Sequence, residues 1–302
     1  MVSKKLLKSA RTAVSLAEPK KKERFLVVTD TEKCSIGKAL FQAASEKCEA
    51  LMIVMKPTGQ HGREPLSIVA NAMQESDIVY CATRYSLTHT DASRKTAKKK
   101  GRVATLPGIT EGVLTRGMDA DYKSIRKTNS RLAKKMKKAK VIRVKARKTE
   151  FFVKRGKRKV VEDGAQVKKG SVVNLPGGEV FFSPKGFEGY FTGTHGAMKN
   201  KTFIVRDGRV RDCMDSKLKK KIWGIKNARN IAEFAIGTNP GAKMKGVTLE
   251  DEKVLGTCHV AIGDSKSIGG TTNADIHWDF VIKKPDIWFD KEKIMEKGKL
   301  LI

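Results

Sequence analysis

The chain has 302 residues, a formal net charge of +31 and an apolar share of 39%. This length suits two domains, and no stretch approaches the run of about 18 apolar residues that a membrane-spanning helix needs. The five cysteines are scattered and form no C-x-x-C pair, which argues against a disulfide framework and against a zinc-finger-type site.

The N-terminal segment is expected to form an amphipathic helix. Leu6, Ala10, Ala13 and Val14 recur there at helical spacing. The apolar stretch is too broken to be the core of a signal peptide. The sequence therefore predicts a cytoplasmic protein that does not enter a membrane.

Short apolar strands alternate with helices over the first half of the chain. Strands are expected at residues 24–30, 50–56, 77–83 and 102–108. Helices are expected at residues 34–48, 65–76, 90–100 and 119–138. This alternation indicates a parallel sheet that is covered on both faces. We therefore predict a Rossmann-like α/β domain over residues 1–140, without a nucleotide site because no G-x-G-x-x-G follows the first strand.

The pattern changes from about Lys140 onward. Short strands punctuated by glycine follow, and Asp207-Gly208 is typical of a hairpin turn. One helix, near residues 217–230, interrupts them. The sequence predicts a mostly antiparallel, barrel-like α+β domain over residues 141–302.

The positive charge is spread along the chain rather than confined to one motif. Such a surface attracts polyanions. No nucleic-acid-binding motif accompanies it, and aromatic residues make up only 6% of the chain, which offers few stacking platforms. We expect nucleic acid to bind non-specifically, if it binds.

Residues 256–280 form the segment of the sequence that is richest in candidate metal-ligating side chains. The segment NADIHWDFVI reads as a strand, on which His277 and Asp279 point to the same face and Trp278 points away. His259 stands in GTCHVAIGD, a little upstream. Two imidazoles and a carboxylate form a common minimal set for a divalent metal.

Two glutamates extend this candidate site. Glu233 lies inside the apolar stretch NIAEFAIG, where a carboxylate is costly unless it is paired or bound to a cation. Glu179 follows Pro-Gly-Gly at the start of a strand, where a bend can hold it towards a cavity. Taken alone, Glu179 reads as an exposed glutamate beside a turn. We predict a metal-binding second domain from the combination of Glu233 and His259 with the strand that carries His277 and Asp279.

Taken in order, these motifs resemble the thermophilic metalloaminopeptidases of the aminopeptidase T and S type. The resemblance runs through residues 86–110 (SLTHTDASRKTAKKKGRVATLPGIT), 174–184 (NLPGGEVFFSP), 231–240 (IAEFAIGTNP), 253–264 (KVLGTCHVAIGD) and 269–281 (GGTTNADIHWDFV). It implies a Rossmann-like domain followed by a barrel-like one, a homodimer and a peptide substrate.

The resemblance also implies a ligand set. In that family two divalent metals are held by two glutamates, two histidines and an aspartate. The matching positions here are Glu179, Glu233, His259, His277 and Asp279. Two ions of zinc, cobalt or manganese are therefore expected, with peptide hydrolysis at the N-terminal residue. No residue is assigned as the general base, because each obvious carboxylate is already a ligand.

One departure from the family keeps an alternative open. The peptidases carry a tyrosine shortly after the first histidine, whereas DSKSIGG stands at that place here. A related branch, resembling 2,5-dihydroxypyridine 5,6-dioxygenase, uses one Fe(II) held by two histidines and an aspartate. His259, His277 and Asp279 satisfy such a triad. A non-catalytic, polyanion-binding protein is the lesser alternative.

Overall fold

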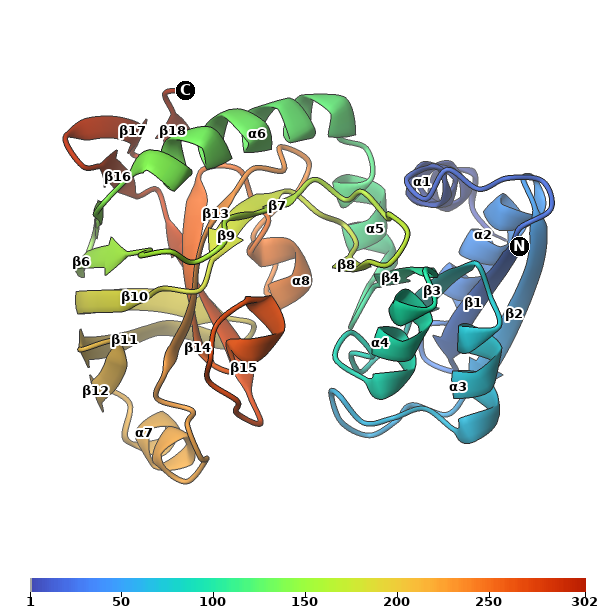
Figure 1. Ribbon diagram of the computed structural model, residues 1–302, viewed down its shortest axis with the longest axis horizontal. Helices are drawn as coiled ribbons and strands as arrows, with labels where there is room; N and C mark the ends of the chain where they lie inside the picture. The colour runs from blue at the N-terminus through green and yellow to red at the C-terminus, as the bar shows by residue number, and fades with distance from the viewer. Residues whose placement is uncertain (1) are drawn as a thin grey trace. The chain divides into compact units, whose positions relative to one another are not determined.

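The computed structural model describes residues 2–302, except for the side chain of Ser267. The chain divides into two compact units (Figure 1). Unit 1 consists of Met1–Ala120 and Ala165–Gly177, and unit 2 of Asp121–Gly164 and Gly178–Ile302. Within residues 2–302, no helix combines the length and the apolar character needed to cross a membrane.

Unit 1 is built on a parallel sheet with the strand order β2-β1-β3-β4-β8. Its strands are β1 (Arg24–Asp30), β2 (Glu49–Met55), β3 (Ile78–Ala82), β4 (Arg102–Thr105) and β8 (Val172–Asn174). Its helices are α1 (Lys4–Ser15), α2 (Cys34–Ser45), α3 (Ser67–Gln74), α4 (Asp91–Lys98) and α5 (Glu111–Gly117). The predicted α/β unit with a parallel sheet is confirmed.

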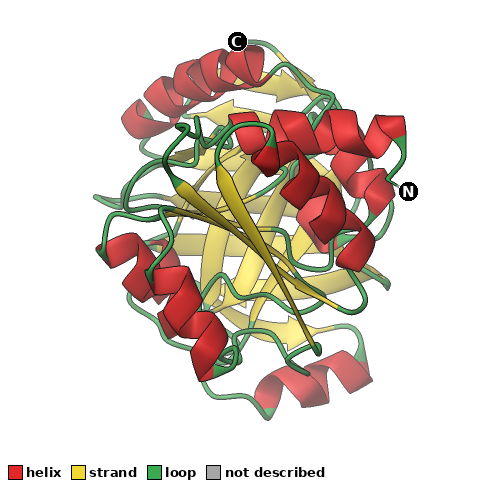
Figure 2. Cartoon of the chain, turned by 90° about the vertical axis from the view of Figure 1, so that its right-hand side faces the viewer, coloured by secondary structure: helices red, strands yellow, loops and turns green. Residues whose placement is uncertain are grey.

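Both faces of this sheet are covered, because successive residues of a buried strand point to opposite sides. Leu26 and Val28 of β1 pack in a cluster with Val69 of α3 and Ala92 of α4. On the other face the hydroxyl of Tyr80 donates to a backbone carbonyl of α1. Figure 2 shows helices on both sides of these strands.

Unit 2 contains a 13-stranded antiparallel sheet that curls into a half-barrel. Its strands are β5 (Ile142–Ala146), β6 (Thr149–Lys154), β7 (Val161–Asp163), β9 (Glu179–Phe182), β10 (Gly186–His195), β11 (Met198–Arg206), β12 (Arg209–Cys213), β13 (Ile231–Gly237), β14 (Thr257–Gly263), β15 (His277–Lys283), β16 (Asp286–Phe289), β17 (Glu292–Glu296) and β18 (Lys299–Leu300). The helices of this unit are α6 (Tyr122–Lys138), α7 (Ser216–Trp223), α8 (Thr248–Asp251) and the 3₁₀ turn η1 (Lys266–Ile268). The predicted mostly antiparallel, barrel-like part is confirmed.

The core of unit 2 lies between the inner face of this sheet and α6. Leu132, Ala133 and Met136 of α6 belong to it. So does a chain of phenylalanines in which Phe151 stacks on Phe187 with ring centroids 4.6 Å apart. This apolar layer occupies one face of the central strands and leaves their other face for polar groups.

Three details show what the local sequence determines and what the tertiary context determines. The expected hairpin turn forms: Asp207 and Gly208 both have positive φ, and Arg206 pairs with Arg209 across the turn. Strand β8, expected in the second domain, instead extends the parallel sheet of unit 1, where Val172 pairs with Val103. Helix α6, expected in the first domain, contacts β7 and β9 of unit 2.

Candidate metal centre

The expected site residues lie on one face of four neighbouring strands in unit 2. The strands run in the order β15-β14-β13-β9. The alternate residues of these strands, including Phe234, Val260 and Phe280, lie in the apolar core. The opposite face carries Glu179 on β9, Glu233 on β13, His259 on β14, and His277 and Asp279 on β15. The structure therefore brings together all five residues.

Small residues and a β-bulge shape this polar face. Ala261 pairs with Glu233 on one side and with Asp279 on the other, so only a methyl group separates the two carboxylates along the row. The register of β13 shifts between Ile231 and Glu233. Because of this bulge, Ile231 enters the core while Glu233, two residues later, points to the opposite face.

The donor atoms converge closely. His259 Nε2 lies 3.6 Å from Glu179 Oε2, 3.6 Å from Glu233 Oε1 and 3.8 Å from Asp279 Oδ1. His277 Nε2 lies 3.2 Å from Glu233 Oε2 and 3.3 Å from Asp279 Oδ1. The two oxygens of Glu233 thus face different histidines.

These contacts define overlapping groups of donor atoms. One group is Glu179, Glu233 and His259, and a second is Glu233, His277 and Asp279. A third contains Glu252 with His259 and Asp279. Glu233, His259 and Asp279 each belong to two of these groups, so the groups share donor residues.

Glu252 and Lys253 also lie at the site, although the sequence did not predict either of them there. They follow α8 within the run LEDEKV, whose charged residues are all buried. Charged runs are ordinarily solvated, so composition alone offered no signal. Gly237 is the sequence feature connected with this burial, because a Cβ at that position would lie 2.3 Å from the carbonyl oxygen of Val254. That close approach holds the Glu252–Lys253 backbone against β13.

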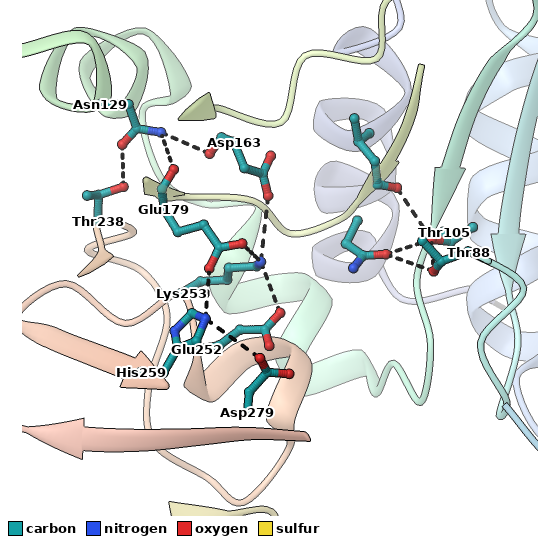
Figure 3. A network of polar contacts seen from close by, with 12 residues as sticks. Thr88, Thr105, Asn129, Asp163, Glu179, Thr238, Glu252, Lys253, His259 and Asp279 are labelled. Atoms are coloured by element: carbon teal, nitrogen blue, oxygen red, sulfur yellow. Dashed lines mark hydrogen bonds and ion pairs between the residues drawn. The ribbon is translucent and has the colours of Figure 1, made fainter. Parts of the chain in front are cut away.

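Lys253 is a buried cation surrounded by carboxylates (Figure 3). Its ammonium donates a hydrogen bond to Glu179 Oε1. It also lies 2.9 Å from Glu252 Oε1 and 3.6 Å from Asp163 Oδ2. Although burial opposes the charged form, these carboxylates hold the pKa of Lys253 well above its ordinary value.

The histidines are strongly biased towards the protonated form. Burial disfavours the charge on His259, but contacts with Glu233, Glu179 and Asp279 raise its pKa to about 9. Burial likewise opposes the charge on His277, yet Asp279 and Glu233 hold its pKa well above the usual range. The carboxylates therefore form a strongly cation-seeking pocket.

The carboxylates divide into two classes. Burial raises the pKa of Glu179 to about 7 and that of Glu252 to about 8, despite the opposing effect of Lys253. For Glu233 and Asp279 the histidines outweigh the burial and lower the pKa of each. Glu233 and Asp279 are thus the anionic centre of the site.

Surrounding groups fix the orientation of the donors. The Asp264 carbonyl lies 2.7 Å from His277 Nδ1, which leaves Nε2 directed at Glu233 and Asp279. Asn129 of α6 donates to the backbone carbonyl of Glu179 at 3.1 Å, as Figure 3 shows. Near the site, the carbonyl of Asp279 lies 2.9 Å from Nδ1 of His195.

Unsatisfied atoms indicate that the site suits a metal ion. Among the described side chains, Glu179 Oε2 and His259 Nδ1 are buried and have no hydrogen-bond partner. A buried polar atom without a partner is costly, and a bound cation would satisfy the carboxylate oxygen. Carboxylate oxygens and imidazole nitrogens are also the donor types that first-row divalent ions accept.

Figure 3 also draws a separate polar cluster in unit 1. Thr88 Oγ1 and Thr105 Oγ1 lie 2.7 Å apart, and Thr105 donates to Asn174 Oδ1 at 2.7 Å. This cluster joins β4 to the end of β8 and contains no titratable group, so it accounts for local structure.

Two solved structures are similar in fold to this chain over nearly its whole length. A 2,5-dihydroxypyridine dioxygenase from Pseudomonas putida KT2440 has a TM-score of 0.82 and 15% identity, over 98% of this chain and 96% of that one. Wild-type AmpT from Thermus thermophilus has a TM-score of 0.71 and 13% identity, over 99% of both chains. At such identities these similarities establish the fold alone.

The family comparison is more specific. No curated protein sequence matches the chain significantly. The family model described as thermophilic metalloprotease (M29) matches residues 60–300, which is most of the chain. This match confirms the resemblance that the ordered motifs carry. The chain therefore belongs to the thermophilic metalloprotease family M29.

Proposed function

We propose that the chain is a metal-dependent aminopeptidase that releases N-terminal residues from peptides. The observation that carries this proposal is the pair of donor groups that share Glu233, in a chain of a metalloprotease family. We assign Glu179, Glu233 and His259 to one ion, and Glu233, His277 and Asp279 to the other. Zinc, cobalt or manganese would suit these ligands.

The chemistry proposed for the site divides between the ions and the protein. The ions, when bound, would lower the pKa of a water molecule and polarise the scissile carbonyl. The Asp264 carbonyl orients the imidazole of His277 so that Nε2 would be available to an ion. Glu252 lies beside His259 and Asp279, outside the five expected ligands. Because it is a carboxylate next to the donor groups that is assigned to neither ion, we propose Glu252 for proton transfer.

The test is release of leucine from a chromogenic leucyl amide by the purified protein with added cobalt, zinc or manganese. We expect metal-dependent turnover that a chelator abolishes. Glu233→Gln should reduce the activity at least about a hundredfold, because it removes a negative charge that both donor groups share. Glu75→Gln makes the same chemical change at an exposed position and should leave activity unchanged. No turnover over a broad panel of amides and peptides would reject the aminopeptidase proposal.

A second candidate is a mononuclear Fe(II) ring-cleaving dioxygenase. Two observations favour it: the closely spaced His259, His277 and Asp279, and the similarity in fold to the dihydroxypyridine dioxygenase. Oxygen consumption with a dihydroxypyridine, together with one iron per chain that is lost in air, would select this candidate. Amide hydrolysis without oxygen uptake would exclude it.

We also propose a homodimer and a peptide substrate, as the family resemblance implies. Sedimentation of the purified chain tests the first point, and a molar mass equal to one chain at micromolar concentration would contradict it. The expected cytoplasmic location stays a prediction.

A further inference from the structure

Lys253 places a permanent positive charge inside one of the two donor groups. Its side chain is 2% exposed, and its ammonium contacts Glu179, Glu252 and Asp163. A buried ammonium is stable only when carboxylates compensate for its lost hydration. Three carboxylates around one ammonium form the kind of pocket that would otherwise attract a metal cation.

The backbone holds Lys253 in this position. The Lys253 carbonyl accepts a hydrogen bond from the Asn239 amide at 2.8 Å, and the Leu255 amide donates to the Asn239 carbonyl at 3.1 Å. The missing side chain at Gly237 lets this segment lie directly against β13. The ammonium is therefore part of the folded site.

The Lys253 ammonium changes what Glu179 can offer to a metal ion. One of its oxygens, Oε1, accepts the hydrogen bond from Lys253, and the other, Oε2, remains without a hydrogen-bond partner 3.6 Å from His259 Nε2. Glu179 therefore offers a metal ion a single oxygen, and its negative charge is already balanced by the ammonium. The group of Glu179, Glu233 and His259 is consequently a weaker cation site than its residue types suggest.

The other donor group has no such competitor. Over the described residues, no lysine or arginine lies within ion-pair distance of Glu233 or Asp279, whose ion-pair partners are His259 and His277. A histidine can give up its proton to bind a metal ion, whereas the Lys253 ammonium is held in place by three carboxylates and by the backbone hydrogen bonds of its segment. The two donor groups thus differ in charge although they share Glu233.

We propose that Lys253 acts as an internal cation at the Glu179 position, so that the two donor groups bind divalent ions in order and with unequal affinity. This inference rests on the metal site of the proposed function. The first ion binds at Glu233, His277 and Asp279. The second binds at Glu179, Glu233 and His259 only against the repulsion of Lys253. At low metal concentration the protein is a one-metal protein with an ammonium in place of the second ion.

The experiment is a titration of the full-length, metal-free chain with Mn²⁺ or Zn²⁺, with bound metal counted by elemental analysis. We expect one tight ion in the wild type and a second that binds at least about a hundredfold more weakly. Lys253→Met keeps the length of the side chain and removes its charge, and should tighten the second site at least about tenfold. Lys283→Met, an exposed change on the same strand as His277, is the matched control and should leave both affinities unchanged.

Electron paramagnetic resonance of bound Mn²⁺ gives an independent reading. The wild type with one equivalent should give the signal of an isolated ion, and Lys253→Met with two equivalents that of a coupled pair. Two equally tight ions in the wild type would overturn this inference and leave the proposed function standing, and so would an unchanged second site in Lys253→Met. Absence of any bound ion would overturn both. If Lys253→Met does not fold without metal, the wild-type titration still decides.

Discussion

At the scale of single residues, the two imidazoles of the proposed site would have to exchange a proton for a metal ion. In the metal-free protein the neighbouring carboxylates keep a proton on His259 up to a pKa of about 9, and the pKa of His277 is also well above its ordinary value. The Asp264 carbonyl accepts a hydrogen bond from His277 Nδ1, so the proton that leaves is the one on Nε2, which faces Glu233. Metal binding is therefore coupled to proton release.

This coupling predicts a pH dependence of metal affinity. Because both folded-state pKa values are raised, protons compete with the metal throughout the neutral range and lose that competition only as the pH rises. The affinity should increase between pH 6 and pH 8 by about tenfold per pH unit for each proton released. Calorimetry in two buffers of different ionisation enthalpy would measure the proton count. His277→Gln should lower that count, and an affinity that does not change with pH would contradict the assignment.

At the scale of the elements, the strand register brings the candidate ligands together around a small residue. Glu233, Ala261 and Asp279 stand side by side on three strands, with the small residue in the middle. The bulge in β13 turns Glu233 out of the core, and Gly263 allows the end of β14 to approach the Ile276 carbonyl, where a Cβ would lie 2.0 Å away. The geometry of the site therefore depends on the positions of small residues as well as on its candidate ligands.

A larger residue in the middle of this row is expected to block the site. Ala261→Leu would extend a branched side chain between the carboxylates and should weaken binding of the first ion at least about tenfold. Ala261→Ser keeps the volume small and should bind nearly as the wild type does. Competition with a chromogenic chelator measures both, with circular dichroism to show that each variant is folded. Wild-type affinity in Ala261→Leu would show that the ion does not lie between Glu233 and Asp279.

At the scale of the whole molecule, the metal centre and the positive charge are separate properties. The candidate ligands, Lys253 and the carboxylates around it all lie in unit 2, either on one sheet or in the segment that packs against it. The net charge of +31 is distributed over the chain and includes many exposed lysines. A charge of this kind attracts polyanions through counterion release and carries no sequence information.

Polyanion binding should therefore be weak in specificity and strongly dependent on salt. We expect retention on heparin at low ionic strength and a loss of affinity for duplex DNA of at least about tenfold between 50 and 200 mM salt. Duplexes of unrelated sequence should bind equally well. Retention that persists far above physiological salt, or a clear preference for one sequence, would instead indicate a dedicated nucleic-acid site.

Much of this protein was accessible from local patterns in the sequence. The alternation of apolar strands and helices predicted the parallel sheet of unit 1, and the Asp207-Gly208 pair predicted a hairpin of unit 2, because these features depend on residues near one another in the chain. The H-x-D strand predicted that His277 and Asp279 share a face, since side chains alternate along any strand. Ordered motifs brought Glu179, Glu233 and His259 into the same hypothesis.

The tertiary structure alone decided what surrounds those residues. Burial of Glu252 and Lys253 depends on the packing of a charged segment against Gly237, and charged side chains in a sequence ordinarily indicate a solvated surface. The direction of Glu233 depends on a bulge that strand alternation cannot anticipate. The sequence by itself determined which residue types are available for a metal. Long-range packing decided that an ammonium competes for one of their carboxylates, because only a folded chain brings Lys253 to Glu179, 74 residues away.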